Sequence, residues 1–183
     1  MIYLLRHGLD DENFVGGWSN VDLTNEGIDQ VNKVTELIKD LEIKKIYSSD
    51  VKRAITTSNI INSYLNVPIE YTPLLREQNK GDANGMDREI ANVRYKEFME
   101  SIDVDKKYPN GESLRDLYNR INKLIDIIKD YDKVLLITHR GVINMFYYIL
   151  NDVSLDMDKK RFGVTHASLH CLNLKEGSIK KIF

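Results

Sequence analysis

Short apolar runs that alternate with longer amphipathic segments constrain the fold of this chain more than any other feature of its sequence. Residues 2–5, 43–47 and 134–137 are strand-like runs, whereas residues 25–40 and 114–128 repeat apolar side chains at helical spacing. Strands that alternate with helices favour layered structures in which the helices cover a sheet. The sequence therefore predicts an α/β fold, a three-layer sandwich with a mostly parallel central sheet and helices on both faces.

Local signals place the remaining elements. Ser49 is expected to cap a helix that carries Arg53 in its first turn, because serine favours helix N-caps. Val67–Tyr71 is predicted to be an edge strand. A helix from about Gly141 to Leu150 and a closing hairpin that turns near Glu176 and Gly177 complete the order.

Length and composition bound the organisation of the chain. The 183 residues, 42% of them hydrophobic, suffice for one domain over 1–183, in which the polar segment from about 78 to 110 is expected to act as a lid. A net charge of -2 gives no global field for nucleic acid or an anionic membrane. A lone Cys171, with neither a signal-like start nor a membrane-spanning run, fits a soluble cytoplasmic protein, monomeric or homodimeric.

The tripeptide Arg6-His7-Gly8 follows the first strand-like run. A guanidinium beside an imidazole is a poor cation site but a good anion site, because arginine presents a planar fork of donors. Gly8 would let the backbone approach a ligand closely, and its amide could contact the anion. Taken alone, however, a histidine at a strand end is more often an ordinary packed residue.

Two further positions strengthen the anion-binding interpretation. Arg53 lies where a strand passes into a helix, and helix N-termini favour anions. Thr138-His139-Arg140-Gly141 repeats the pattern at the end of another strand. Arg53 alone would be interpreted as a solvated surface charge. The anion-binding interpretation therefore depends on the other motifs that accompany it.

Taken in order, these motifs and several others resemble the histidine phosphatase superfamily, whose members are similar to phosphoglycerate mutase. The resemblance covers nearly the whole chain. Its motifs are Leu5-Arg6-His7-Gly8 with Asn13, Gly17-Trp18, Leu23-Thr24 and Gly27, then Ser48-Ser49-Asp50 with Arg53-Ala54 and Thr57, then Leu75-Arg76-Glu77, Gly111-Glu112-Ser113 and Ile137-Thr138-His139.

The resemblance implies specific roles for these residues. His7 would be the nucleophile and Glu77 the proton donor, with Arg6, Arg53 and His139 around the phosphoryl group. Gly8, Asn13 and Arg140 join the expected phosphate-binding and substrate-binding set. No metal or cofactor is expected, because positioning and fixed charges carry most of phosphoryl transfer. For Glu77, a surface carboxylate paired with Arg76 is the alternative.

The expected reaction is metal-independent hydrolysis of a small phosphorylated metabolite through a phosphohistidine. A mutase that returns the phosphoryl group to its substrate is the first alternative, and a non-catalytic binder of phosphorylated ligands is the second. The compact size resembles the α-ribazole phosphatase and broad-specificity branches.

Two residues depart from the pattern of the superfamily. Asp10 stands where threonine or serine is usual and would repel a phosphate dianion, unless it turns away, pairs with a basic residue or accepts hydrogen bonds from substrate hydroxyls. His166 stands where asparagine is frequent. A structural or surface histidine is the favoured interpretation, with a role in the pocket as the alternative. Arg140 could reach a second anionic group of a substrate or face solvent.

Overall fold

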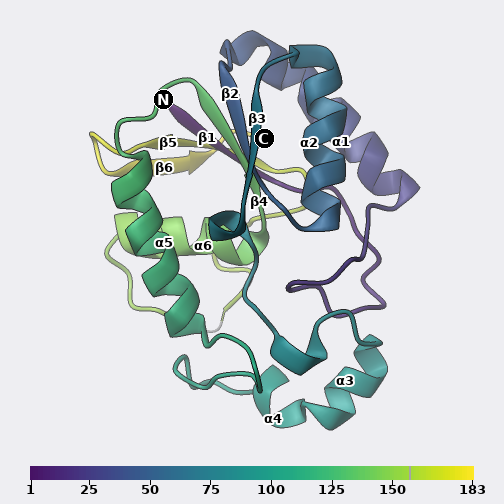
Figure 1. Ribbon diagram of the computed structural model, residues 1–183. Coiled ribbons are helices and arrows are strands. Elements are labelled where there is room, and N and C mark those ends of the chain that lie inside the picture. The colour runs from purple at the N-terminus through teal and green to yellow at the C-terminus, as the bar shows by residue number, and fades with distance from the viewer. Residues whose placement is uncertain (157) are drawn as a thin grey trace.

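The computed structural model of the protein describes residues 1–156 and 158–183, and within them the strands form one six-stranded sheet (Figure 1). The strands are β1 (Ile2–Arg6), β2 (Lys45–Ser49), β3 (Ile69–Thr72), β4 (Val134–Thr138), β5 (Leu169–Asn173) and β6 (Ser178–Lys181). They lie in the order β3-β2-β4-β1-β5-β6, with β1 to β4 parallel and β5 and β6 antiparallel. The expected mostly parallel sheet, with β3 at its edge, is confirmed.

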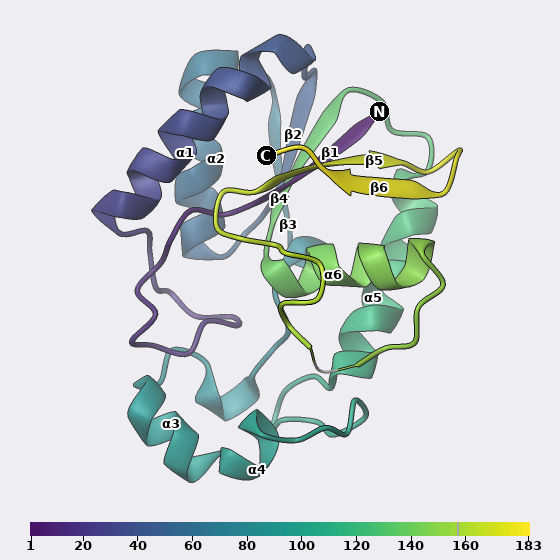
Figure 2. The ribbon, with the colours of Figure 1, turned by 180° about the vertical axis from the view of Figure 1, so that it is seen from behind.

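Helices cover both faces of this sheet (Figures 1 and 2). Helices α1 (Asn25–Ile38) and α2 (Lys52–Leu65) lie on one face, and α5 (Leu114–Ile128) and α6 (Arg140–Leu150) lie on the other. A 3-10 turn, Lys39–Leu41, extends α1. The three-layer arrangement predicted from the sequence is therefore confirmed. None of the helices in the described ranges has the length and hydropathy to span a bilayer.

The two faces of the sheet bury separate hydrophobic cores. Leu4 and Leu136 belong to the core under α5 and α6, whereas their neighbours Leu5 and Leu135 belong to the core under α1 and α2. Successive side chains of a strand point to opposite faces, so a strand covered on both sides has to be apolar throughout. This burial explains why the central strands read as continuous apolar runs.

Capping explains where two helices begin and corrects a third expectation. Thr24 accepts a hydrogen bond from the Gly27 amide, and Ser113 forms a capping box with Asp116. The prediction that Ser49 caps α2 is wrong. Ser49 is the last residue of β2 and is still paired with β3. Val51 occupies the N-cap position instead and contributes no side-chain hydrogen bond.

The segment between β3 and α5 forms a further layer beyond the carboxyl ends of the parallel strands. It contains 3-10 turns at Pro73–Leu75 and Gly81–Ala83 and the short helices α3 (Arg88–Arg94) and α4 (Lys96–Met99). It has its own small core, formed by Val15, Ala83, Ala91, Tyr95 and Tyr108. This layer contains residues 78–110, whose role as a lid stays a prediction.

Candidate active site

The carboxyl ends of two adjacent parallel strands bring two histidines together. His7 directly follows β1 and His139 directly follows β4, which pair in parallel with Arg6 opposite Thr138. The two imidazole rings lie 5.0 Å apart, and both residues are buried. The predicted meeting of these two strand ends is therefore what the structure shows.

Hydrogen bonds fix the tautomer and orientation of His7. Its Nδ1 donates to the carbonyl oxygen of Gly8 at 2.7 Å, because a carbonyl can only accept. The other ring nitrogen, Nε2, is therefore unprotonated, and Nε of Arg53 donates to it at 3.2 Å. The lone pair of His7 Nε2 is thus held beside a fixed guanidinium.

The surroundings keep both imidazoles neutral. Burial, followed by the charge of Arg53, lowers the pKa of His7 well below 6.5. Burial and the charges of Arg53 and Arg6 lower the pKa of His139 in the same way. His7 is therefore available as an uncharged nucleophile at neutral pH.

Arg53 is the centre of the hydrogen-bond network around the histidines. It enters from the first turn of α2 and is 1% exposed. Its Nη2 donates to the carbonyl of Gly17 at 2.9 Å and to Nδ1 of His139 at 3.2 Å. His139 in turn donates from Nε2 to the hydroxyl of Ser49 at 2.9 Å. The hydroxyl expected to cap α2 orients this histidine instead.

Arg6 is the second buried guanidinium. Its Nη1 donates to the carbonyl of Val164 at 3.1 Å and its Nη2 contacts Nε2 of His166, whereas its buried Nε has no hydrogen-bond partner among the described residues. Burial and the nearby Arg140 lower the pKa of Arg6 to about 10, so the side chain stays charged at neutral pH. A buried donor without a partner is rare in folded proteins and indicates a place for a ligand atom.

Glu77 faces the cavity at the N-terminus of α6. Its Oε2 accepts the amide hydrogen of Gly141 at 3.0 Å, and a Cβ atom on Gly141 would lie only 2.1 Å from Oε1. The alternative pairing with Arg76 is wrong, because Arg76 forms a bidentate ion pair with Asp50, with both N···O distances at 2.6 Å.

A second arginine network holds the loop that carries Glu77. Arg120 of α5 donates to the backbone oxygens of Leu74 and Arg76 at 2.8 Å and of Glu77 at 3.1 Å. The same guanidinium pairs with the carboxylate of Glu112, with N···O distances of 3.0 and 2.9 Å. Glu112 of the Gly111-Glu112-Ser113 motif therefore helps to position the loop.

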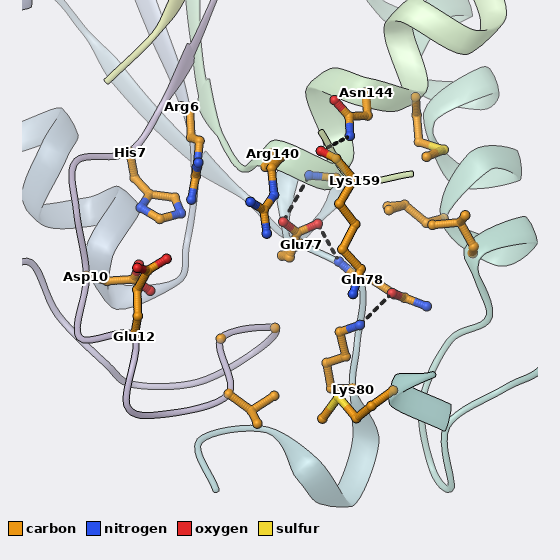
Figure 3. A pocket seen from close by; sticks show the side chains of 18 of the residues that line it. Arg6, His7, Asp10, Glu12, Glu77, Gln78, Lys80, Arg140, Asn144 and Lys159 are labelled. Atoms are coloured by element: carbon orange, nitrogen blue, oxygen red, sulfur yellow. Dashed lines mark hydrogen bonds between the residues drawn. The ribbon is translucent and has the colours of Figure 1, made fainter. Parts of the chain in front are cut away.

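One cavity connects most of the predicted site residues. Arg6, His7, Arg53, Glu77 and Arg140 line it, and His139 lies just behind them. In Figure 3, Arg6 and His7 stand at one end, with Arg140 and Glu77 between them and Lys80. The alternative in which Arg140 faces only solvent is therefore wrong.

The structure does not bring Gly8 and Asn13 to this cavity. The Gly8 amide is directed to Thr57 Oγ1 at 3.4 Å, and a Cβ atom on Gly8 would lie 2.4 Å from the carbonyl of Gly27 in α1. Gly8 thus permits helix packing rather than ligand approach. Asn13 is exposed in a turn that begins at Asp11, and its carbonyl accepts the amide hydrogen of Arg88 at 2.7 Å.

The two departures from the family pattern meet at the phosphate end of the cavity. Oδ2 of Asp10 lies 3.4 Å from Nε of Arg53, and Oδ1 lies 3.7 Å from Nε2 of His166. Burial opposes ionisation of Asp10, but the nearby side chains of His166 and Arg53 hold its pKa well below its usual range. Asp10 therefore pairs with a basic residue, and the surface interpretation of His166 is wrong, since its side chain is 15% exposed.

Several cavity residues were not identified from the sequence. They are Gln78, Lys80, Asn144 and Lys159. The Ser19 hydroxyl, which accepts from Arg53 behind the cavity wall, was not identified either. Only Asn144 carried a usable signal, since it is the one polar residue within the apolar run from Val142 to Leu150.

The arrangement as a whole is suited to an anion. The two buried arginines repel a metal cation and attract a phosphate group. In the described ranges, no cluster of three or more histidine, cysteine, aspartate or glutamate side chains is arranged to hold a metal ion.

Comparison with known proteins yields relatives of two kinds. The chain is 34% identical over 149 residues to a protein of Bacillus subtilis named uncharacterized phosphatase PhoE, covering 78% of this chain and 73% of that one. It is 28% identical over 196 residues to a 2,3-bisphosphoglycerate-dependent phosphoglycerate mutase of Bacteroides fragilis, covering 82% and 79%.

Solved structures agree on the fold. The α-ribazole phosphatase of Shigella flexneri superimposes with a TM-score of 0.82 at 21% sequence identity, covering 98% of this chain and 93% of that one. The family model described as histidine phosphatase superfamily, branch 1, matches residues 2–181. With this match and the 34% identical relative, the chain belongs to the histidine phosphatase superfamily.

Proposed function

We propose that this protein is a phosphatase that hydrolyses phosphate monoesters of small metabolites through a phosphohistidine on Nε2 of His7. The observation that carries the proposal is the neutral imidazole whose unprotonated nitrogen lies beside Arg53 in a cavity that Arg6 also lines. The unpartnered Nε of Arg6 offers a further donor to a phosphoryl oxygen. Such fixed charges stabilise phosphoryl transfer without reorganisation at the moment of reaction.

The reaction would proceed in two balanced steps. In the first, the lone pair of His7 Nε2 attacks phosphorus, the ester P–O bond breaks, and the leaving oxygen takes a proton from Glu77. In the second, water attacks phosphorus and gives a proton back to Glu77, while the P–N bond breaks and its electron pair returns to Nε2. Neither step requires a metal ion.

A mutase is the competing function, because a relative with that name is 28% identical to this chain over 196 residues. It would return the phosphoryl group from His7 to a second hydroxyl of the substrate before water could attack. Hydrolysis is favoured because the relative named as a phosphatase is the more similar of the two at 34% identity. A protein that binds phosphorylated ligands without turnover is disfavoured, because such a protein would not need Glu77 as a proton donor.

The test is turnover of a chromogenic aryl phosphate in EDTA near pH 7, with quenching in alkaline detergent to trap an acid-labile phosphoenzyme. Wild type should turn over and yield the phosphoenzyme, whereas His7→Ala should do neither. Loss of turnover in EDTA would reject metal independence. Conversion of 3-phosphoglycerate to its 2-isomer faster than phosphate release would reject hydrolysis in favour of the mutase.

A further inference from the structure

The cavity continues beyond Glu77 to a second group of cations. Lys80 and Lys159 line this part, which lies across from His7 in Figure 3, and Arg140 stands beside Glu77 between the two ends of the cavity. Nζ of Lys80 donates to Oε1 of Gln78 at 2.9 Å and approaches the hydroxyl of Tyr108 at 3.3 Å, and both partners are neutral. These three cations thus belong to the wall of the same cavity as the proposed nucleophile.

The charge of Glu77 acts on Lys80 and Lys159 from a distance, but no carboxylate in the described ranges forms an ion pair with them. The ion pairs at the cavity join Asp10 to Arg53 and Asp156 to Arg161, and none in the described part of the chain includes Lys80, Arg140 or Lys159. Burial and the charges of Lys159 and Arg140 lower the pKa of Lys80 to about 7. Like charges gathered in a partly buried site repel one another, and a bound anion would relieve that repulsion.

A buried polar atom in the same wall also lacks a partner. Asn144 is 4% exposed, and its Nδ2 donates to the carbonyl of Lys159 at 3.2 Å. Its Oδ1 is buried and has no hydrogen-bond partner among the described residues. Asn144 lies one turn after Arg140 on α6, so the two side chains project from the same side of the helix. A ligand hydroxyl that donates to Oδ1 would satisfy this acceptor.

We propose that Lys80, Arg140, Asn144 and Lys159 form a second subsite, which binds an anionic group on the alcohol part of the substrate. The substrate would then be a phosphate monoester that also carries a carboxylate or second phosphate, and a hydroxyl within reach of Asn144. The inference rests on the proposed phosphatase function and names its substrate class. Glu12 and Asp158 also line the cavity and, like Lys159, are exposed, so water and salt screen all three charges. The less exposed Lys80 and Arg140 are screened less.

The test compares substrate pairs that differ only in the second anion. Glycerol 3-phosphate is matched with 3-phosphoglycerate, glucitol 6-phosphate with 6-phosphogluconate, and fructose 6-phosphate with fructose 1,6-bisphosphate. In at least one pair, kcat/KM for the anionic member should exceed that for the neutral member by about tenfold, the ratio that a modest charge-assisted contact gives. The last pair separates a phosphate from a carboxylate.

Variants assign the preference to the subsite. Lys80→Met and Lys159→Met, which lie on different segments, should each reduce the anionic-to-neutral ratio at least threefold, and Lys80→Arg should retain it. Asn144→Leu should raise KM for both members of a pair and leave the ratio alone. Lys175→Met, an exposed lysine in the turn between β5 and β6, is the matched control and should change neither value.

A ratio near one in every pair would overturn the inference while leaving the phosphatase proposal intact, provided that the aryl phosphate is hydrolysed. An unchanged ratio in both lysine variants would overturn it as well. Absence of turnover with every ester would instead reject the proposed phosphatase. Calorimetric titration would then test the subsite, because the subsite requires that 3-phosphoglycerate bind more tightly than glycerol 3-phosphate. Equal affinities would overturn the inference.

Discussion

The carboxylate of Asp10 lies 3.4 Å from Nε of Arg53, so the pocket proposed for a phosphate already contains an anion of the protein itself. Arg53 is also the group that donates to the proposed nucleophile, His7. A phosphate dianion entering this pocket must therefore compete with Asp10 for the same guanidinium.

Asp10→Ser should strengthen the binding of inorganic phosphate and vanadate about tenfold, because it removes a like charge from the pocket. The measurement is competitive inhibition of aryl phosphate turnover. Asp11→Ser, the neighbouring carboxylate outside the cavity wall, should leave the inhibition constants unchanged. Weaker binding in Asp10→Ser would mean that Asp10 mainly holds Arg53 in place.

His166→Asn should have the opposite effect and weaken phosphate binding, because the His166 imidazole lies 3.7 Å from Asp10 and contacts Nη2 of Arg6. The double variant with Asp10→Ser should return toward the wild-type affinity. A double-mutant cycle measures this coupling directly. Strictly additive effects of the two substitutions would show that the two side chains act independently.

Glu77→Gln should reduce kcat for alkyl phosphates by about 10²–10⁴-fold, the usual contribution of general acid–base catalysis. The loss should be much smaller for an aryl ester whose leaving group needs no proton. Gly141→Ala should show the same dependence on the leaving group, since its Cβ atom would collide with Oε1 of Glu77. An equal loss for all esters would assign Glu77 to binding instead.

Arg120→Met should cost about 3–5 kcal/mol of stability, because it breaks a partly buried ion pair and leaves Glu112 without its partner. It should also lower kcat, since the backbone of the Glu77 loop loses three hydrogen bonds. Arg115→Met on the same helix is the control, because its exposed pair with Asp105 should be worth less than about 1 kcal/mol. Urea unfolding measures the stability of both variants, and ester turnover measures kcat.

Acid should destabilise the fold through three buried histidines. Burial holds the pKa of His7 and His139 well below 6.5 and that of His170 at about 4. As the pH falls below 6.5, the unfolded chain binds protons on these histidines and the folded chain does not, so the free energy of unfolding decreases. Each histidine contributes a slope of about 1.4 kcal/mol per pH unit.

His170→Asn should reduce the slope of the free energy of unfolding against pH by about 1.4 kcal/mol per pH unit between about pH 6 and pH 4.5. Tyr147→Phe is the matched control, because it deletes the hydrogen bond between the Tyr147 hydroxyl and Nδ1 of His170 but keeps the imidazole. It should lower stability without changing the slope. Equal slopes in wild type and His170→Asn would show that His170 titrates freely in the folded protein.

The parts of the fold that local patterns determine could be predicted from the sequence. Leu4, Leu5, Leu135 and Leu136 form apolar runs because the strands are covered on both faces, and such runs are visible without a structure. Placement of His7 and His139 followed from the same runs, because parallel strands end at one edge of the sheet.

The residues that could not be predicted depend on contacts between distant segments. Lys80 and Lys159 are separated by 79 positions and line one cavity, in which the loop after β3 contacts the N-terminus of α6 through Glu77 and Gly141. Ser49 has the residue type of an N-cap, but strand pairing with Thr72 overrides that local preference. Asn13 matched a motif position, yet the turn from Asp11 directs it to solvent.

The position of β1 in the sheet bears on how the protein is made. β1 is flanked by β4 and β5, whose residues lie more than 125 positions further along the chain. During synthesis, β1 has neither neighbour until the ribosome has released Val134–Thr138, and it has only one until Leu169–Asn173 follows. The anion-binding pocket is thus completed late. A nascent chain that ends before Leu169 should lack the proposed phosphatase activity.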